Sequence, residues 1–121
     1  MSAPADFPAS MLENCYVLNE HNEVRSALEE GMSLIQWATW TFGRNDRQVA
    51  RDIVIQPGGT EITISTVFLG TNMNHGLTEG PPLVFETMIF GHDLARVIDR
   101  YTSYAEAEAG HAKIVKGIQE A

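Results

Sequence analysis

Two residues between Glu61 and Gly91 have side chains that could do acid–base chemistry. Glu86 stands in the middle of an apolar stretch that is typical of a strand. If its side chain faces the core, the carboxylate must be paired or neutral, because an unpaired buried charge is very costly. His75 follows Asn74 in a loop, and it is the second group that general acid–base catalysis would need. The alternatives are a structural salt bridge or an exposed edge position for Glu86, and turn formation for His75.

The candidate partners of this glutamate are four arginines, Arg44, Arg47, Arg51 and Arg100. The first three follow Trp37 and Trp40, and bidentate and stacking contacts from this group could bind a phosphate or a nucleotide base. The even spacing of Arg47 and Arg51 predicts that they share one face of a strand. The alternative is that the flanking Asp46 and Asp52 neutralise the arginines on a solvated face, and that the tryptophans belong to a core or an interface.

The remaining histidines and the single cysteine form no catalytic or metal-binding pattern. His111 lies on the apolar stripe of a predicted helix and is interpreted as a hydrogen-bonded core or interface histidine. His21 and His92 are expected in exposed loops. Cys15 has no partner for an internal disulfide, which fits a reducing compartment. We therefore expect no catalytic residue, metal or cofactor to be identifiable from motifs.

Composition predicts one acidic globular domain. The chain has 121 residues, of which 44% are hydrophobic and 20% charged, as in an ordinary single domain. The net charge of −8 disfavours direct binding of nucleic acid, and the first thirty residues hold six acids against one base, Arg25. The absence of a long apolar run and of a signal peptide predicts a soluble protein of the cytoplasm.

The elements that must position these residues predict an α+β domain, in which an antiparallel sheet of about four strands carries a central helix and a C-terminal amphipathic helix on one face. Residues 1–14 are expected to be a flexible arm, and residues 15–121 the domain. Cys15–Asn19 predicts a small strand or hairpin. A helix is predicted from Ser26 to Phe42, with a later start near Met32 or Ser33 as an alternative, because Gly31 weakens the first turn.

The expected strands are Gln48–Ile55, Glu61–Leu69, Leu83–Phe90 and, more weakly, Val97–Tyr101. The first two are predicted to pair as a hairpin across Pro57–Thr60, and the third to lie beside the second. Ser103 and Glu106 form a capping-box pattern that begins the last helix. Its apolar stripe, which must pack on a sheet face, consists of Tyr104, Ala107, His111, Ile114, Val115 and Ile118.

Four phrases of the sequence, WATW, ISTVFLG, GPPLVFETMIFG and RYTSYAEAEAGH, resemble a family of small uncharacterised proteins of bacteriophages and prophages. The resemblance covers roughly Tyr16 to Val115. The chain departs from the family pattern at TNMNHG after Gly70, where an aspartate-histidine type of sequence is usual, and at His92, where a second glycine is usual. The resemblance implies a phage accessory protein in a bacterial host cytoplasm.

Three functions are compatible with this sequence. The leading hypothesis is non-enzymatic binding to a host or phage macromolecule, with countering of host defence as one role, because an acidic surface suits a basic protein partner. The second is binding or sequestering of a nucleotide by the arginines and tryptophans. The third is a small enzyme that uses Glu86 and His75. A homodimer is expected if Leu83–Phe90 is an edge strand, since an unpaired apolar edge attracts partner strands.

Overall fold

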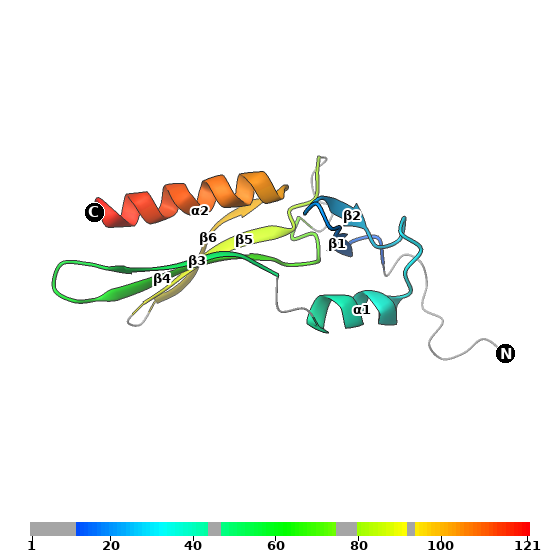
Figure 1. The fold of residues 1–121 in the computed structure, drawn as a ribbon, viewed down its shortest axis with the longest axis horizontal. Coiled ribbons are helices and arrows are strands. Elements are labelled where there is room, and N and C mark those ends of the chain that lie inside the picture. The colour runs from blue at the N-terminus through cyan, green and yellow to red at the C-terminus, as the bar shows by residue number, and fades with distance from the viewer. Residues whose placement is uncertain (1–11, 44–46, 75–79, 92–93) are drawn as a thin grey trace.

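The computed structural model describes the chain except for residues 1–11, 44–46, 75–79 and 92–93. Its elements in chain order are β1 (Tyr16–Leu18), β2 (Val24–Ser26), α1 (Leu34–Gly43), β3 (Gln48–Ile55), β4 (Glu61–Phe68), β5 (Phe85–Gly91), β6 (Leu94–Tyr101) and α2 (Tyr104–Gln119). The predicted α+β class is confirmed. In Figure 1, α2 lies along one face of the large sheet, and the β1–β2 hairpin and α1 lie beyond one end of it.

The large sheet has the order β3-β4-β5-β6, and every neighbouring pair is antiparallel. The predicted hairpin between β3 and β4 is confirmed, and its turn places Gly58 and Gly59 at φ values of 97° and 92°, which favour glycine. The third predicted strand lies beside the second as expected. It is β5, an interior strand, so the edge that would have led to a homodimer is not present at this position.

Alternation along β4 separates the two faces of the sheet. Ile62, Ile64, Thr66 and Phe68 are buried, whereas the residues between them are exposed or half-buried. The buried set faces α2, since Thr66 hydrogen-bonds to His111 of that helix. We call the opposite side the open face.

The last helix matches its prediction closely. Ser103 is the N-cap, and its hydroxyl accepts a hydrogen bond from the amide of Glu106 at 3.1 Å. The apolar stripe of α2 packs on the sheet, with Ala107 and His111 buried. The core continues toward the β1–β2 hairpin through Phe68 and Phe85, whose rings meet edge-on at 5.2 Å. Burial of each such ring contributes about 1.5–3 kcal/mol.

The helix start at Ser26 is wrong, and the predicted alternative, a start near Met32 or Ser33, is confirmed. Ser26 ends β2, and its hydroxyl accepts from the amide of Glu29 at 3.3 Å within a turn. The chain then passes Gly31 at φ 71°, and α1 starts after Ser33, which forms a reciprocal capping box with Gln36 at 3.1 and 2.7 Å. The second capping pattern is therefore the one that begins a helix.

The arm predicted over residues 1–14 falls mostly outside the described residues. Leu12, however, is buried in a cluster with Val17, Ala27 and Trp37. Leu12, which belongs to the predicted arm, is thus part of a packed cluster.

Two glycines of α2 provide a matched test of how tightly the helix lies on the sheet. A Cβ atom at Gly110 would overlap the ring of Tyr101, whereas one at Gly117 would meet open space. We expect Gly110→Ala to lower the free energy of unfolding by about 1–3 kcal/mol through overpacking, and Gly117→Ala to raise it by up to about 1 kcal/mol through helix propensity. Urea denaturation of both variants measures these values, and equal effects would contradict the close contact.

Candidate functional site

A chain of buried hydrogen bonds crosses the sheet under α2. His111 Nε2 lies 2.7 Å from Asp52 Oδ2, and its Nδ1 lies 2.7 Å from the hydroxyl of Thr66. That hydroxyl is 2.5 Å from the hydroxyl of Thr87, which is 3.0 Å from the hydroxyl of Tyr101. The chain therefore connects α2 with all four strands of the sheet.

One direction of donation satisfies the donors and acceptors of this hydrogen-bond chain. Burial raises the pKa of Tyr101, so the phenol stays protonated and donates to Thr87. Thr87 then donates to Thr66, and Thr66 donates to Nδ1 of a neutral His111 whose Nε2–H donates to Asp52. We assign this tautomer because it gives each hydroxyl one acceptor and leaves both ring nitrogens satisfied.

The order acid, imidazole, hydroxyl resembles the triad of a nucleophilic hydrolase, but its accessibility is wrong for catalysis. Thr66 is fully buried and His111 is 3% exposed. The exposed member is Asp52, whose side chain is 54% exposed. Since no substrate carbonyl can approach Thr66, the chain holds α2 on the sheet, and the prediction of His111 as a hydrogen-bonded core histidine is confirmed.

Glu86 forms the structural salt bridge that was one of its predicted alternatives. Its Oε2 lies 3.2 Å from Nε of Arg100, the residue directly opposite it on β6. The Glu86 side chain is 11% exposed and that of Arg100 is 37% exposed, so the pair lies at the boundary of the open face. His75, the predicted second group of an acid–base site, lies outside the described residues.

The structure separates the members of the predicted anion site. Trp37 is buried, and its Nε1–H donates to the carbonyl of Tyr16 at 3.0 Å. Trp40 packs edge-on against Phe68, with ring centroids 6.1 Å apart. Both tryptophans are therefore packing residues, as the alternative interpretation predicted. Asn74 is half-buried, and its amide donates to the side chain of Asn72 at 3.0 Å.

The arginines are not brought to one face either. The guanidinium of Arg47 lies over the ring of Phe42, 5.9 Å from its centroid, whereas Arg51 is exposed on the open face. β3 begins after Arg47, and its register with β4 shifts between Gln48 and Ala50, so the predicted alternation does not extend from Arg47 to Arg51. Arg44 lies outside the described residues, and Asp52 binds His111 rather than an arginine.

A concave feature is lined by the β1–β2 hairpin and its neighbouring residues, by the first turn of α2, and by Pro81 and Pro82. One part has a volume of about 710 Å³ and is lined by His21, Asn22, Glu23, Val24, Thr102, Ser103, Tyr104, Ala105 and Glu108. A second part, of about 520 Å³, is lined by Glu13, Tyr16, Val24, Ser26, Leu28, Glu29, Pro81, Pro82 and Thr102. Because the two parts share Val24 and Thr102, we treat them as one feature and call it the acidic groove.

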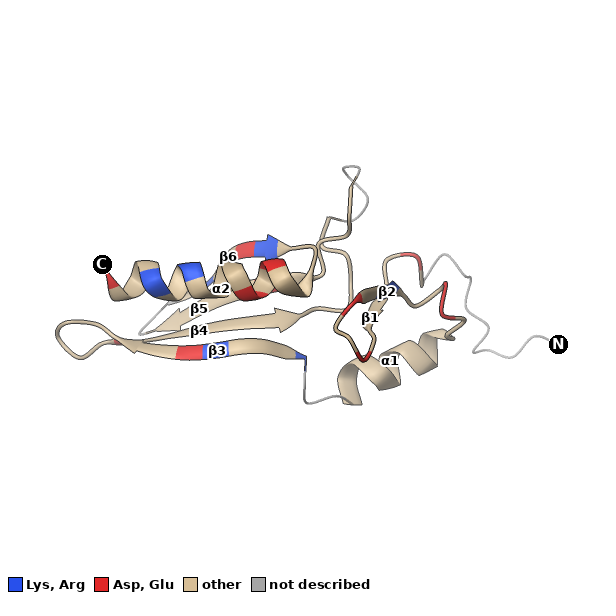
Figure 2. Ribbon diagram, turned by 45° about the horizontal axis from the view of Figure 1, so that its top comes forward, with Lys and Arg blue, Asp and Glu red and all other residues tan. Residues whose placement is uncertain are grey.

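The acidic groove repeats one chemical arrangement in its two parts. Each part contains one tyrosine and two glutamates, and the described lining residues include no lysine or arginine. Burial, and then the negative charge of Glu29, raise the pKa of Tyr16. In Figure 2 acidic residues gather around the β1–β2 hairpin and the start of α2, while the lysines of α2 lie toward its other end.

Local hydrogen bonds hold the walls of the acidic groove. Asn19 accepts from the amides of His21 and Glu23 at 2.9 Å each, and its side-chain amide donates to the Glu23 carboxylate at 2.7 Å. On the opposite wall, Tyr104 is anchored by the edge of Phe85, with centroids 6.1 Å apart. The groove therefore presents its carboxylates on ordered backbone.

Sequence reasoning missed this groove as a site. The surplus of acids up to Glu30 was visible, but Glu108 and Tyr104 come from a helix far along the chain. Only the packing of α2 beside the hairpin brings these residues to one surface. The aromatic residues at helical spacing indicated a core stripe, and Tyr104 serves both purposes because it is half-buried.

In comparisons with known proteins, no family model, curated protein or solved structure matches this chain. Among the described residues, no helix has the length and apolarity needed to cross a membrane.

Removing the hydroxyl of Thr66 tests how much the buried hydrogen-bond chain contributes to stability. We expect Thr66→Val to lower the free energy of unfolding by about 1–3 kcal/mol, because His111 Nδ1 and the Thr87 hydroxyl both lose a partner. Thr63→Val, on the same strand but on the open face, is the matched control and should change it by about 0.5 kcal/mol at most. Urea denaturation at pH 7 provides both values, and equal losses would contradict the special role of Thr66.

The free energy that the N-terminal cap of α2 contributes to folding should decrease as the pH falls. Hydrogen bonds from the hydroxyls of Thr102 and Ser103 lower the pKa of Glu106. A carboxyl with a lowered folded pKa stabilises the fold above its unfolded pKa, near about 4.3, and this contribution is lost as the pH falls through the folded pKa.

We therefore expect Ser103→Ala to cost about 1 kcal/mol at pH 7 and less in acid, because protonated Glu106 no longer gains from the hydroxyl. Ser33→Ala is the control, since Ser33 pairs with Gln36, which does not titrate. Its cost should stay constant across the same pH range in denaturation measurements.

Proposed function

We propose that the protein is a small phage-type accessory protein that binds a basic segment of a host or phage protein in the acidic groove, without enzymatic turnover. The observation that carries this proposal is the composition of the groove, in which each part combines a tyrosine with two glutamates. Tyrosine offers its ring face to the stem of a lysine or arginine, and the glutamates neutralise the charged end.

The form of the groove favours an extended segment over a small ligand. Its two parts, about 710 and 520 Å³, meet at Val24 and Thr102 and run along the hairpin. A segment with two cationic side chains could place one in each part. Charge attraction would also speed the encounter, since an acidic surface steers a basic partner.

For the other two functions, the described residues form no comparable site. A nucleotide would need the arginines near its phosphates, but Trp37 is buried and Arg47 lies over Phe42. An enzyme would need an accessible acid beside a second group, whereas Glu86 is paired with Arg100. The resemblance to phage proteins supports a host or phage partner and a bacterial cytoplasm as the place of action.

A peptide with two lysines separated by aliphatic residues, labelled with a fluorophore, tests the proposal by anisotropy. Wild-type protein should bind it, and binding should weaken as salt is added. Glu23→Gln combined with Glu108→Gln should weaken affinity by about two- to thirtyfold, since an exposed charge pair contributes about 0.2–1 kcal/mol. A peptide with glutamates in place of the lysines should not bind.

The matched control is Asp99→Asn combined with Glu120→Gln, which removes the same charge at exposed positions outside the lining of the groove. It should leave affinity nearly unchanged. If both double variants weaken binding equally, the effect comes from net charge alone and the groove is not the site. If wild-type protein does not bind the lysine peptide, the proposal fails.

A further inference from the structure

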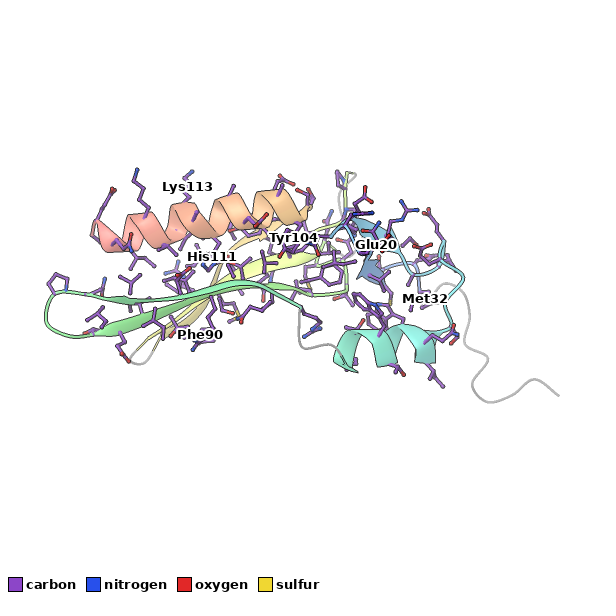
Figure 3. The ribbon with its side chains drawn as sticks, viewed as in Figure 1. Glu20, Met32, Phe90, Tyr104, His111 and Lys113 are labelled. Atoms are coloured by element: carbon purple, nitrogen blue, oxygen red, sulfur yellow. The ribbon has the colours of Figure 1, made fainter. Side chains whose placement is uncertain are left out.

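The open face of the large sheet carries exposed apolar side chains among its polar ones. Ile53, Phe90 and Val97 are 50%, 39% and 37% exposed, and Met88 beside them is half-buried. An antiparallel sheet with one face in water normally carries polar residues on that face. Figure 3 shows Phe90 on the side of the sheet opposite His111 and α2.

The strand register gathers these residues into two adjacent rows. One row contains Ile53, Thr63, Phe90 and Ala95, and the next contains Arg51, Ser65, Met88 and Val97. No described element covers these rows, because α1 lies beyond the end of the sheet and contacts β1 (Figure 1). Met88, Phe90, Ala95 and Val97 are neighbours on β5 and β6, and Ile53 lies across Thr63 from Phe90. Exposed apolar patches of this kind often mark interaction sites.

Charges flank the apolar rows with opposite sign. Glu61, at the hairpin end of β4, is exposed on this face, and Arg51 is exposed two residues beyond Ile53. A surface with an acid toward one end and a base toward the other complements itself when a second copy is laid on it with reversed strand direction. With strands of seven or eight residues, the four-stranded sheet covers about 25 by 19 Å. The open face of a second copy has the same size and could cover it completely.

We propose that the open face packs against the open face of a second copy, in a two-fold dimer with a β-sandwich core. The two-fold axis crosses the strands between the two apolar rows. Phe90 of one protomer then lies over Met88 of its partner, and Ile53 lies over the aliphatic stem of the partner's Arg51, at the spacing of about 10 Å that is usual between packed sheets. Glu61 of each protomer comes within side-chain reach of Arg51 of the other.

The dimer is separate from the acidic groove. The groove lies where the β1–β2 hairpin meets the first turn of α2, beyond the end of the sheet, whereas the dimer uses the centre of the open face. Each protomer therefore keeps its groove accessible, and the dimer presents two grooves.

Analytical ultracentrifugation of the full chain over a range of concentrations tests this dimer. Ile53→Lys should shift the protein to monomer, because it places a charge in the apolar centre, whereas Ile35→Lys, at an exposed isoleucine of α1, should not. Arg51→Glu and Glu61→Arg should each raise the dissociation constant by about tenfold. The chain that carries both substitutions should recover the wild-type value, because the pair is restored with its signs exchanged.

Lys113→Glu, on α2, reverses the same charge away from the face and should leave the dimer unchanged. Circular dichroism of every variant establishes that the fold is retained. A monomer at all concentrations up to about 1 mM overturns the proposal, as does a dimer that Ile53→Lys leaves intact. If the chain with both charge substitutions does not recover the dimer, the reversed arrangement is overturned. If a different protein binds this face in place of the second copy, the dimer itself is overturned.

Discussion

The position of α2 on the sheet depends on the two hydrogen bonds of His111. A buried imidazole that lost either partner would cost more than the bond itself contributes, because a desolvated polar atom would remain. Nε2 meets Asp52 and Nδ1 meets Thr66, so a shift of the helix by one turn would break both contacts. Apolar side chains alone would tolerate such a shift more readily. The polar chain thus selects one placement of the helix among several of similar apolar burial.

That placement also creates the acidic groove. Tyr104 and Ala107 precede His111 on the same stripe of α2 at helical spacing, so fixing the histidine fixes the first turn of the helix. Tyr104 is then held against Phe85, and Glu108 faces the β1–β2 hairpin across the groove. The two sides of the sheet consequently have different roles. One carries the helix that builds the groove, and the other leaves an apolar surface for a second copy.

Much of this fold could be predicted from the sequence, because its signals are local. Turn glycines and alternation located β3 and β4, and the Ser103 cap located α2. The sequence leaves the start of α1 open between Ser26, which fits a capping pattern, and Met32 or Ser33, beyond Gly31. The pairing of Ser26 in β2 decides for the later start. The sites were harder. The charge of Glu86 predicted a partner, and the strand register identifies this partner as Arg100. The acidic groove, in contrast, joins residues that are distant in sequence, so no local pattern predicts it.

The acidic groove, to which the first turn of α2 contributes one side, is proposed to receive basic protein segments. Backbone amide chemical shifts in two-dimensional NMR test this proposal most directly, with unlabelled lysine-containing peptide added to isotope-labelled protein. We expect shift changes confined to the groove lining within residues 13–29 and 102–108, with the amides of β3 unchanged. Changes centred on β3 and its arginines, or changes spread evenly over the molecule, would show that the acidic groove is not the binding site.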